Sequence, residues 1–404
     1  MSSAYLVAYA TADGKTADDG KGRNGTYTAE LLKFLDQPGR NLRDVMEDTQ
    51  LAVEESSKGA QVPKIYGDTA KFRDVFLRPG RAVPTPNPPV QVASLVPEPV
   101  TQPSPAPVAQ PTAPPTVQAG QTLKDCADCP ELVVIPGGSF QMGSGAPEQA
   151  LAKQGGVGDN ILSRESPQHV VSVRSFAAGK YAVTKGEFAA FVRAKGYKTE
   201  AEAGDGCYAW TGSKWEKDKA YNWRNVGFAQ ADDNPVVCVS WNDTQAYLQW
   251  LSQTSGKSYR LLSEAEREYA ARAGSQSAFW WGDSISTSQA NFDGTGNSYN
   301  NSPKGEWRKA TVPVSSFKAN PFGLYNVHGN VWEWVQDCFH DNYNGAPSDG
   351  SAWTTGCNGD YRVLRGGSWY DYPASLRSAF RNWDSPDNRN NLDGFRVART
   401  LLTP

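Results

Sequence analysis

The sequence predicts an α+β fold with much irregular loop for the C-terminal two thirds of the chain, preceded by a partial α/β segment and a proline-rich linker. Three observations predict this division of the 404 residues. All 13 tryptophans lie beyond residue 209, all six cysteines lie beyond residue 125, and 13 of the 27 prolines lie between Pro79 and Pro115. Two unlike globular parts joined by a stiff spacer explain this distribution, so we expect domains at 1–78 and 124–404 and a linker at 79–123.

Charge and hydropathy disfavour several classes of function. The formal net charge is −3 and the pI is near 5.8, so we expect no nucleic-acid partner. No apolar run approaches the length of a transmembrane helix, so we expect no membrane span. The opening stretch MSSAYLVAYATADG lacks the basic start and long apolar run of a secretory signal, which makes a cytoplasmic location the default expectation.

Residues 81–121 form the predicted linker. They carry almost no charge and show no hydrophobic periodicity. Such a segment cannot bury enough apolar surface to offset the entropy of ordering, so we expect it to be disordered. Its proline density favours extended polyproline-II spacing. A docking ligand for a proline-recognising module is the alternative to a plain spacer.

The first 78 residues predict only half of an α/β domain. Residues 4–11 (AYLVAYAT) have the composition of a buried strand, and a polar loop follows. Residues 27–34 and 42–53 have the spacing of two amphipathic helices. An incomplete sheet leaves an edge strand exposed, so we do not expect this segment to fold alone.

This segment resembles the small-subunit part of caspase-like, metacaspase-related domains over residues 3–77. The matching strings are LVAYATADGKTADDGKGRNGTYT, LLKFL, DVMEDTQLAV and QVPKIYGD. The protease chemistry of that family needs a histidine that generates a cysteine thiolate. The first histidine and cysteine of the chain are His169 and Cys126, so the segment lacks this dyad. It either docks a caspase-like partner that carries the other half or is a remnant.

The C-terminal part alternates short strands with a few helices. ELVVIPGGSFQMGS predicts two strands around a turn, and a helix is expected from about Thr184. LLSEAEREYAARAG offers a capping box of Ser263 with Glu266 and a terminal Gly274, which predicts another helix. A third helix places four apolar residues on one face: Ala246, Tyr247, Trp250 and Leu251.

These strings resemble the formylglycine-generating-enzyme, or sulfatase-modifying-factor, family over about 270 residues. The matches, in order, are VVIPGGSFQMGS, YAVTKGEF, PVVCVSW, YRLLSEAEREYAAR, NPFGLYNVHGNVWEWVQDCF, RVLRGGSW and GFRVAR. The resemblance implies that family's variant of the C-type lectin fold.

The resemblance does not carry the family's activity with it. In the active oxidases two cysteines, five residues apart, follow the RGGS-aromatic motif and bind copper as thiolates. Asp371 and Leu376 stand at those positions here, so we expect no copper and predict that the chain is not an enzyme. The three histidines also lack the spacing of metal ligands, and no other catalytic motif occurs.

A calcium site is implied by the resemblance in the string NVHGNVWEW. Carried over by position, the ligands are the side chains of Asn326 and Glu333 and the carbonyls of Gly329 and Val331. Oxygen ligands suit this hard cation, which would have a structural role. The alternative is that Asn326 and Glu333 only satisfy backbone groups around a tryptophan core.

The cysteines allow several pairings. Cys207, Cys238, Cys338 and Cys357 could form disulfides, and position favours Cys338 with Cys357. The isolated C-x-x-C of residues 126–129 has no second pair that would support zinc, so a local disulfide or two free thiols is expected.

The segment 362–401 resembles the variable region of diversity-generating-retroelement proteins, which use the same lectin-type fold. A fixed-looking frame (RGGSW, LRSA, PDNRN, GFRVAR) is interrupted by residues that are mostly reachable from an Asn codon by changing its adenines. Trp383 is not reachable in this way. The predicted ligand-binding positions are Tyr370, Asp371, Tyr372, Ala374, Ser375, Phe380, Asn382, Trp383, Asp384, Ser385, Leu392 and Asp393.

The sequence therefore predicts a non-catalytic binding protein that displays these positions as one diversified surface. Large rigid aromatics beside small polar groups suit a protein target. One alternative is an oxidoreductase of the formylglycine-generating type with a different metal centre. Another is a scaffold that docks a caspase-like protease.

Overall fold

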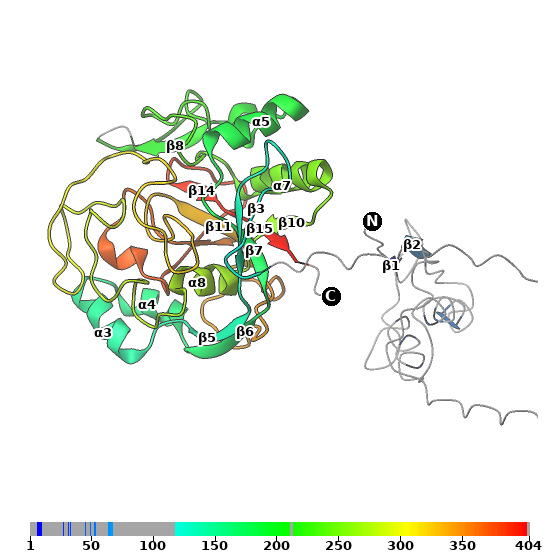
Figure 1. The fold of residues 1–404 in the computed structure, drawn as a ribbon, viewed down its shortest axis with the longest axis horizontal. Helices are drawn as coiled ribbons and strands as arrows, with labels where there is room; N and C mark the ends of the chain where they lie inside the picture. Colours follow the sequence, from blue (N-terminus) through cyan, green and yellow to red (C-terminus); the bar gives the residue numbers. More distant parts are fainter. Residues whose placement is uncertain are drawn as a thin grey trace, which may run out of the picture. The chain divides into compact units, whose positions relative to one another are not determined.

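The computed structural model describes residues 118–210 and 213–401 together with parts of the N-terminus. These parts are the backbone of residues 6–9 and 64–67 and the single residues Tyr27, Leu31, Lys33, Val45, Thr49, Ala52 and Val53. The chain divides into two compact units, Met1–Pro111 and Thr112–Pro404. Figure 1 shows the described residues of the second unit, which we call the C-terminal domain, as a coloured ribbon.

In the N-terminal unit, β1 (Leu6–Tyr9) pairs antiparallel with β2 (Lys64–Gly67). The strand expected within residues 4–11 is therefore confirmed. Thr49 is buried and its Oγ1 donates to the Val45 carbonyl at 2.7 Å, which is one helical turn away. Most of the two helices expected before residue 54 lies outside the described residues, as does the linker before residue 118.

The C-terminal domain is built on two larger sheets and two additional strand pairs (Figure 1). The five-stranded sheet has the order β10 (Tyr259–Leu261), β15 (Val397–Thr400), β7 (Phe176–Gly179), β4 (Leu132–Ile135) and β3 (Thr122–Leu123). The four-stranded sheet has the order β13 (Arg381–Asp384), β12 (Arg362–Arg365), β11 (Trp332–Cys338) and β14 (Asp393–Phe395). The strand pairs are β5 (Gly138–Met142) with β6 (His169–Val173) and β8 (Cys207–Trp210) with β9 (Trp215–Asp218).

Helices occupy the first half of this domain. They are α3 (Ala146–Gln154), α4 (Asp159–Leu162), α5 (Lys185–Lys195), α6 (Glu200–Ala203), α7 (Trp241–Ser255) and α8 (Glu264–Arg272), with 3-10 turns η2 (Ser163–Glu165) and η3 (Pro373–Leu376). From residue 274 to residue 331 no named helix or strand occurs, so this stretch is the long irregular part that the sequence predicts. The mixed helix and strand content confirms the α+β fold class.

The helix boundaries follow local capping chemistry. Thr184 caps α5, which begins where the sequence predicts. At α8 the Glu266 amide donates to Ser263 Oγ at 3.0 Å, and the Ser263 amide donates to the Glu266 carboxylate at 2.9 Å. The predicted capping box is therefore confirmed. Ala273 ends α8 in the left-handed conformation with a φ of 45°, and Gly274 follows with a φ of 92°.

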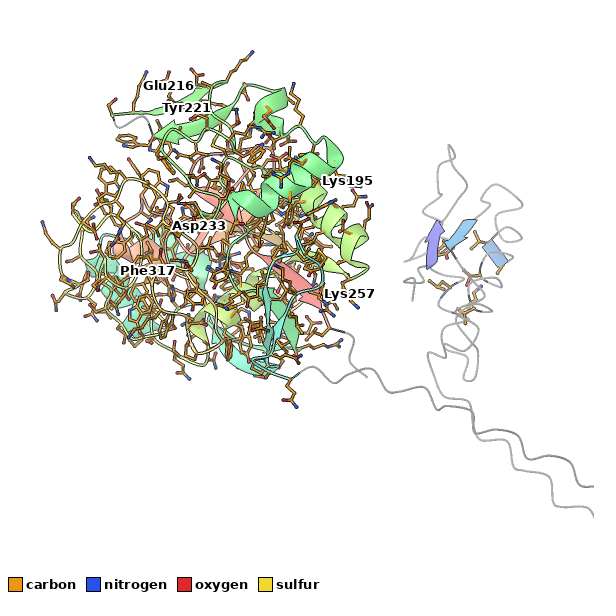
Figure 2. The ribbon with its side chains drawn as sticks, turned by 45° about the horizontal axis from the view of Figure 1, so that its top comes forward. Lys195, Glu216, Tyr221, Asp233, Lys257 and Phe317 are labelled. Carbon is orange, nitrogen blue, oxygen red and sulfur yellow. A yellow bond between two sulfur atoms is a disulfide. The ribbon has the colours of Figure 1, made fainter. Side chains whose placement is uncertain are left out.

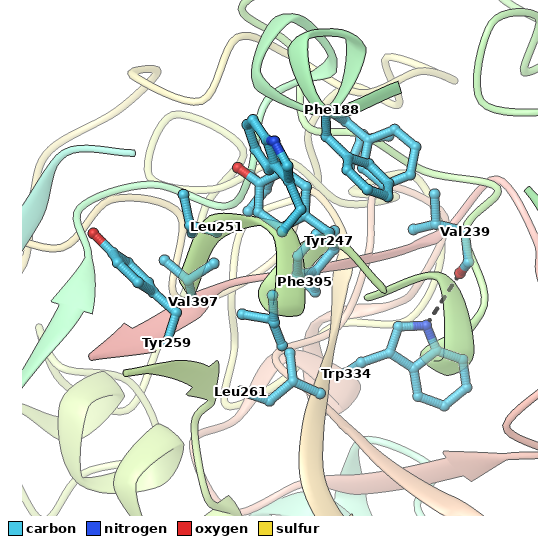
Figure 3. Packing of buried hydrophobic residues seen from close by; sticks show 14 of the residues in the cluster. Phe188, Val239, Tyr247, Leu251, Tyr259, Leu261, Trp334, Phe395 and Val397 are labelled. Carbon is cyan, nitrogen blue, oxygen red and sulfur yellow. Dashed lines mark hydrogen bonds between the residues drawn. The ribbon is translucent and has the colours of Figure 1, made fainter. Parts of the chain in front are cut away.

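The main core lies between α5, α7 and the two sheets. Tyr247 and Leu251 of α7 are fully buried and Trp250 nearly so, which confirms the apolar face expected for this helix. They pack with Phe188 and Phe395, as Figure 3 shows. Lys195 at the end of α5 and Lys257 after α7 point outward instead (Figure 2).

All six cysteines form disulfides in the described part of the chain. The Cys338–Cys357 pair is confirmed, the C-x-x-C forms a local disulfide, and Cys207 pairs with Cys238. Disulfides persist in oxidising compartments and are rare in the cytosol, so the cytoplasmic location stays a prediction that these bonds disfavour. No helix in the described ranges is both long and apolar enough to cross a membrane.

Candidate ligand-binding site in the segment 362–401

The segment 362–401 runs through the centre of the C-terminal domain. It supplies β12, β13 and β14 to the four-stranded sheet and β15 to the five-stranded sheet. Its backbone is therefore fixed by strand pairing on both sides, and the loops between these strands carry most of the predicted binding positions. A rigid scaffold that presents side chains from loops is a common arrangement for binding sites.

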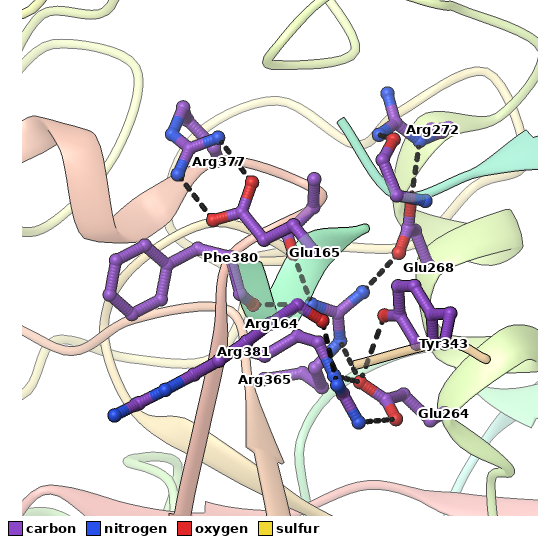
Figure 4. A network of polar contacts seen from close by, with 12 residues as sticks. Arg164, Glu165, Glu264, Glu268, Arg272, Tyr343, Arg365, Arg377, Phe380 and Arg381 are labelled. Carbon is purple, nitrogen blue, oxygen red and sulfur yellow. Dashed lines mark hydrogen bonds and ion pairs between the residues drawn. The ribbon is translucent and has the colours of Figure 1, made fainter. Parts of the chain in front are cut away.

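Four arginines of this segment are buried and paired with glutamates from distant parts of the chain. Arg377 holds Glu165 with contacts of 2.6 and 2.8 Å, and both side chains are fully buried. Arg381 holds Glu264 through two contacts, at 2.6 and 2.9 Å. Figure 4 shows these pairs.

Two further arginines complete this set. Arg365 pairs with Glu268, and Arg396 approaches Glu333 at 2.8 Å. Burial alone would raise the pKa of Glu333, but Arg267 and Arg396 outweigh it and hold that pKa below its ordinary value. We call Arg365, Arg377, Arg381 and Arg396 with their glutamates the arginine frame.

The predicted binding positions differ from the arginine frame in burial. Ten of the twelve are half-buried or exposed, and Tyr372 is the most open at 45% exposure. Ala374 and Asp393 are the two buried ones, at 5% and 1%. Ala374 lies within η3 and its side chain packs in a cluster that includes Leu376, so it is not displayed.

Strand β13 divides its residues between two faces of the sheet. Trp383 pairs with Val363 across β12 and its ring packs on Tyr361 and Phe339, with centroids 4.1 and 5.4 Å apart. Side chains alternate along a strand, so Asn382 and Asp384 point to the opposite face. Trp383 is therefore separated from its neighbours on the strand, and it is also the residue that does not fit the Asn-codon pattern.

An aromatic cluster surrounds Tyr370. Its ring lies 5.0 Å from Trp215, 5.3 Å from Trp210 and 5.7 Å from Trp307, measured between centroids. The sequence reasoning missed these three tryptophans. Trp210 is the last residue of β8 and pairs with Trp215, the first residue of β9. The label of Glu216, the next residue of β9, locates this hairpin in Figure 2. The string YAWTGSKW, with aromatics around a Thr-Gly-Ser turn, was the signal that could have found them.

Beside this cluster lies a recess of about 270 Å³. Its walls are Tyr208 and Trp215 of the hairpin, which are 40% and 37% exposed, and Leu392 of the variable segment. Asn388 and Asn390 provide its polar lining. The recess therefore combines two segments that are far apart in the sequence.

Three aspartates of the segment lie behind this surface. Asp371 accepts from the Ser368 amide at 3.0 Å and from the Ser368 hydroxyl. Asp384 accepts from the Ser385 amide and from the side-chain amide of Asn388. Asp393 Oδ2 is buried without a hydrogen-bond partner among the described residues.

Burial raises the pKa of each of these aspartates above its ordinary value. For Asp393 the negative charges of Asp384 and Asp371 raise the pKa further. Asp393 also stands opposite Trp332 in the parallel β11–β14 pair.

The other predicted positions fall into smaller groups. Phe380 packs on Trp332 with ring centroids 5.9 Å apart, and so borders the aspartates. Ser385 bonds to Asp384 through its amide. Ser375 and Tyr372 lie at η3, where the Tyr372 ring packs close to Gly296. Of the predicted positions, Tyr370 joins the tryptophan cluster and Leu392 lines the recess, whereas Trp383 packs on Phe339 and Ala374 is buried.

The residues predicted to bind calcium do not fit that ion in this arrangement. Both oxygens of Glu333 are engaged by the guanidinium groups of Arg267 and Arg396. A dication beside two buried guanidinium groups would meet strong repulsion. Asn326 Oδ1 is buried and has no hydrogen-bond partner among the described residues, so it could accept a cation. The predicted site would also need a free carboxylate, and Glu333 does not offer one. The calcium site stays a prediction that the pairing of Glu333 disfavours.

Copper does not fit the positions of the family's thiolates either. Asp371 and Leu376 occupy them, and every cysteine of the chain lies in a disulfide. A soft metal that prefers thiolate ligands finds none in this domain.

The fold and the site define a formylglycine-generating-type domain of C-type lectin architecture. Residues 118–401 match the family described as sulfatase-modifying factor enzyme 1-like domain, so the chain belongs to that family. Residues 1–73 match the caspase domain family, which confirms the resemblance of the N-terminal unit. A caspase-like partner for this unit stays a prediction.

Relatives and solved structures agree with this assignment. The formylglycine-generating enzyme of Streptomyces coelicolor is 34% identical over 309 residues, which cover 66% of this chain and 88% of the relative. The structure of PvdO from Pseudomonas aeruginosa matches with a TM-score of 0.58 and 39% identity, over 71% of this chain and 100% of that chain. Treponema denticola variable protein 1 matches with a TM-score of 0.47 and 21% identity, too low to bear on function.

The prediction that the chain is not an enzyme is wrong in the light of these relatives. Several of them, at 31 to 34% identity, are named formylglycine-generating enzymes, which places the chain in an enzyme family. The family also includes a Mus musculus relative named inactive C-alpha-formylglycine-generating enzyme 2, which is 30% identical over 69% of this chain and 88% of its own length. The absent thiolates alone were an insufficient basis for excluding catalysis.

Proposed function

We propose that the C-terminal domain binds a protein or peptide ligand at the surface formed by Tyr370, Leu392 and the β8–β9 hairpin. The observation that carries this proposal is the half-exposed pair of aromatic rings, Tyr208 and Trp215, that walls a recess, with Tyr370 packed against Trp215. Aromatic anchors that remain partly open to solvent are typical of the centres of protein interfaces.

The contrast between the arginine frame and the displayed positions supports diversification of this surface. A buried arginine that neutralises a buried glutamate cannot be exchanged without a large loss of stability. Half-exposed side chains in loops between fixed strands tolerate many substitutions. The displayed positions are also those reachable from Asn codons, except for Trp383, which packs on the other face.

Sequencing tests the diversification. The gene's 3′ end and its neighbouring DNA would be sequenced across many sibling cells. We expect a nearby near-copy of the 362–401 coding segment that differs at adenines matching the displayed positions. A single invariant sequence without such a template would remove this part of the proposal.

Peptide selection tests the binding itself. Peptides displayed on phage would be selected on the full chain, and their affinities compared between wild type and the variant Tyr370→Ala. We expect a loss of about 10- to 30-fold, because an aromatic anchor at an interface centre contributes on the order of 2 kcal/mol. Tyr361→Ala is the control, since Tyr361 is also 36% exposed but packs on Trp383. Equal losses in both variants, or no selected peptide, would contradict the proposal.

An oxidoreductase reaction at the same surface is the second candidate. It is favoured by the enzyme names of the relatives at 31 to 34% identity. The test is oxygen consumption with a cysteine-containing sulfatase-motif peptide and copper or iron supplied. Consumption that exceeds the metal-only blank and disappears in Asp371→Ala would establish it. A rate equal to the blank would remove it and leave the binding proposal untouched.

A further inference from the structure

The Cys338–Cys357 disulfide closes a loop at the end of β11, and we call residues 338–357 the disulfide loop. Asn342 and Asn344 of this loop line a recess of about 510 Å³ together with residues of α3, α4 and η2. Gly350 lines another recess of about 430 Å³, next to residues of β7 and β10. The position of the disulfide loop therefore shapes two hollows of the surface.

His340 lies at the start of the disulfide loop and joins its two ends. The residue is 8% exposed, and its ring stacks on that of Trp353, with centroids 3.5 Å apart and planes 7° apart. His340 Nδ1 lies 3.2 Å from the carbonyl oxygen of Cys338, and Nε2 lies 3.0 Å from the carbonyl oxygen of Thr355. Both ring nitrogens therefore face hydrogen-bond acceptors.

Two acceptors are a demand that only one form of the ring meets. A carbonyl oxygen can only accept a hydrogen bond, so each of the two contacts needs an N–H on the ring. A neutral imidazole has a single N–H, and its other nitrogen would direct a lone pair at a carbonyl oxygen. The imidazolium donates to both oxygens, and its charge is attracted by the face of the Trp353 ring. The arrangement around His340 therefore favours the charged form.

The other two histidines of the chain have different partners. His328 Nδ1 lies 2.8 Å from the Leu376 carbonyl oxygen, and its Nε2 accepts from the Trp280 amide at 3.4 Å. One acceptor and one donor fit the neutral ring, and burial lowers the pKa of His328 to about 3. His169 has one carbonyl partner, and its Nε2 has no hydrogen-bond partner among the described residues. Of the three histidines, His340 alone faces two acceptors.

Other charged groups near His340 bear on its titration. Arg381 of β13 donates to the His340 carbonyl at 3.0 Å and is itself paired with Glu264. Asp337 of β11 is buried, and burial followed by the charge of Glu264 raises its pKa to about 7, so this carboxyl also titrates near neutral pH. The charged residues of the segments that meet the ends of the disulfide loop are Arg164, Glu264, Asp337, Asp341, Arg362 and Arg381.

We propose that His340 is a pH-sensitive clasp, whose imidazolium form ties the carbonyls of Cys338 and Thr355 together and holds the disulfide loop closed. Loss of one ring proton removes one of the two hydrogen bonds and loosens the loop. The clasp is therefore complete at acid pH and is lost as the pH rises past the point at which the folded ring gives up its proton. This inference is independent of the proposed binding function, because it involves neither Tyr370 nor the β8–β9 hairpin.

NMR of the histidine rings in the full chain, with its disulfides intact, tests the charge directly. The three histidines would be labelled with ¹⁵N, and the signals of His340 assigned by their loss in His340→Gln. An imidazolium shows two protonated nitrogens, whereas a neutral ring shows one protonated and one unprotonated nitrogen. We expect the imidazolium pattern for His340 at about pH 7 and the neutral pattern for His328. A neutral pattern for His340 at that pH would overturn the inference.

Hydrogen exchange of the same full chain tests the effect on the disulfide loop. After correction for the intrinsic pH dependence of exchange, we expect the protection of residues 341–356 to fall about tenfold between about pH 6 and about pH 9, because one charge-assisted hydrogen bond is lost. Peptides of α5 should keep their protection. His340→Gln, whose amide does not titrate, should abolish the pH dependence, whereas Asp337→Asn should retain it. Constant protection in the wild type, or a pH dependence that disappears in Asp337→Asn, would reject the clasp.

Discussion

The arginine frame and Asp393 lie on the same forty-residue segment, but they differ in whether a buried charge has a partner of opposite charge. In the frame, Arg377 and Glu165 are both fully buried and hold each other at 2.6 Å. Asp393 is similarly buried, at 1% exposure, but its Oδ2 has no hydrogen-bond partner among the described residues. The difference shows that buried charge in this segment is not always compensated: the frame pairs its carboxylates with arginines, whereas Asp393 is buried without a cation.

Breaking the frame should produce the largest effect. Arg377→Met leaves Glu165 buried without its cation, so we expect the free energy of unfolding to fall by about 3–5 kcal/mol. Urea denaturation of the full chain, followed by tryptophan fluorescence of the C-terminal domain, measures this change. The double variant Arg377→Met with Glu165→Leu should recover most of the loss. Equal instability of the single and double variants would show that packing, rather than charge pairing, is what the frame provides.

Replacing Asp393 should change the free energy of unfolding by less than Arg377→Met does, and in the opposite direction. Asp393→Asn removes an unpaired buried carboxyl, so we expect the free energy of unfolding at neutral pH to rise by about 1–3 kcal/mol. The folded pKa of Asp393 lies above its unfolded value. Its favourable contribution is therefore complete below about pH 4 and is lost as the pH rises through the folded pKa.

The pH series gives this comparison its control. In the same urea denaturation measurement, the difference in free energy of unfolding between Asp393→Asn and wild type should increase from acid to neutral pH. Glu333 has a lowered pKa, so its contribution is present above the unfolded value near pH 4 and is lost as the pH falls further. An advantage of Asp393→Asn that is independent of pH would mean that this carboxyl does not titrate between the two states.

The smallest expected effect concerns calcium. Glu333 is occupied by Arg267 and Arg396, so millimolar calcium or excess EDTA should leave the melting temperature unchanged within about 1 °C. Differential scanning calorimetry of the full chain measures it, with magnesium as the comparison ion. A rise that depends on calcium concentration would restore the site predicted from the sequence.

Much of the fold could be predicted from the sequence, because it is indicated by local residue patterns or by long motifs that match a known family. The capping box at Ser263, the apolar face of α7 and the Cys338–Cys357 pair all appear where they were expected. Of the candidate binding site, only the part that lies within residues 362–401 could be predicted from the sequence. The β8–β9 hairpin meets Tyr370 across about 160 residues of chain, and no spacing rule connects Trp215 to that position.

Burial was the other quantity that the sequence could not supply. Ala374 and Trp383 match or border the variable pattern as well as Tyr370 does. The side chain of Ala374, however, is buried within η3, and Trp383 packs on Phe339. Strand alternation separates Trp383 from Asp384, but the strand itself had to be placed before that rule could apply. The distribution of ion pairs around Glu333 was equally inaccessible, because its arginines come from α8 and from the chain end.

The long reach of the frame limits how this segment can be transplanted. Glu165 stands 212 positions from Arg377, and Glu264 stands 117 positions from Arg381. A chimera that receives only residues 362–401 would bring the four guanidinium groups of the frame into a host that must already hold acids at matching depths. Within one scaffold the displayed side chains are exchangeable, whereas between scaffolds the segment can move only together with its distant carboxylates.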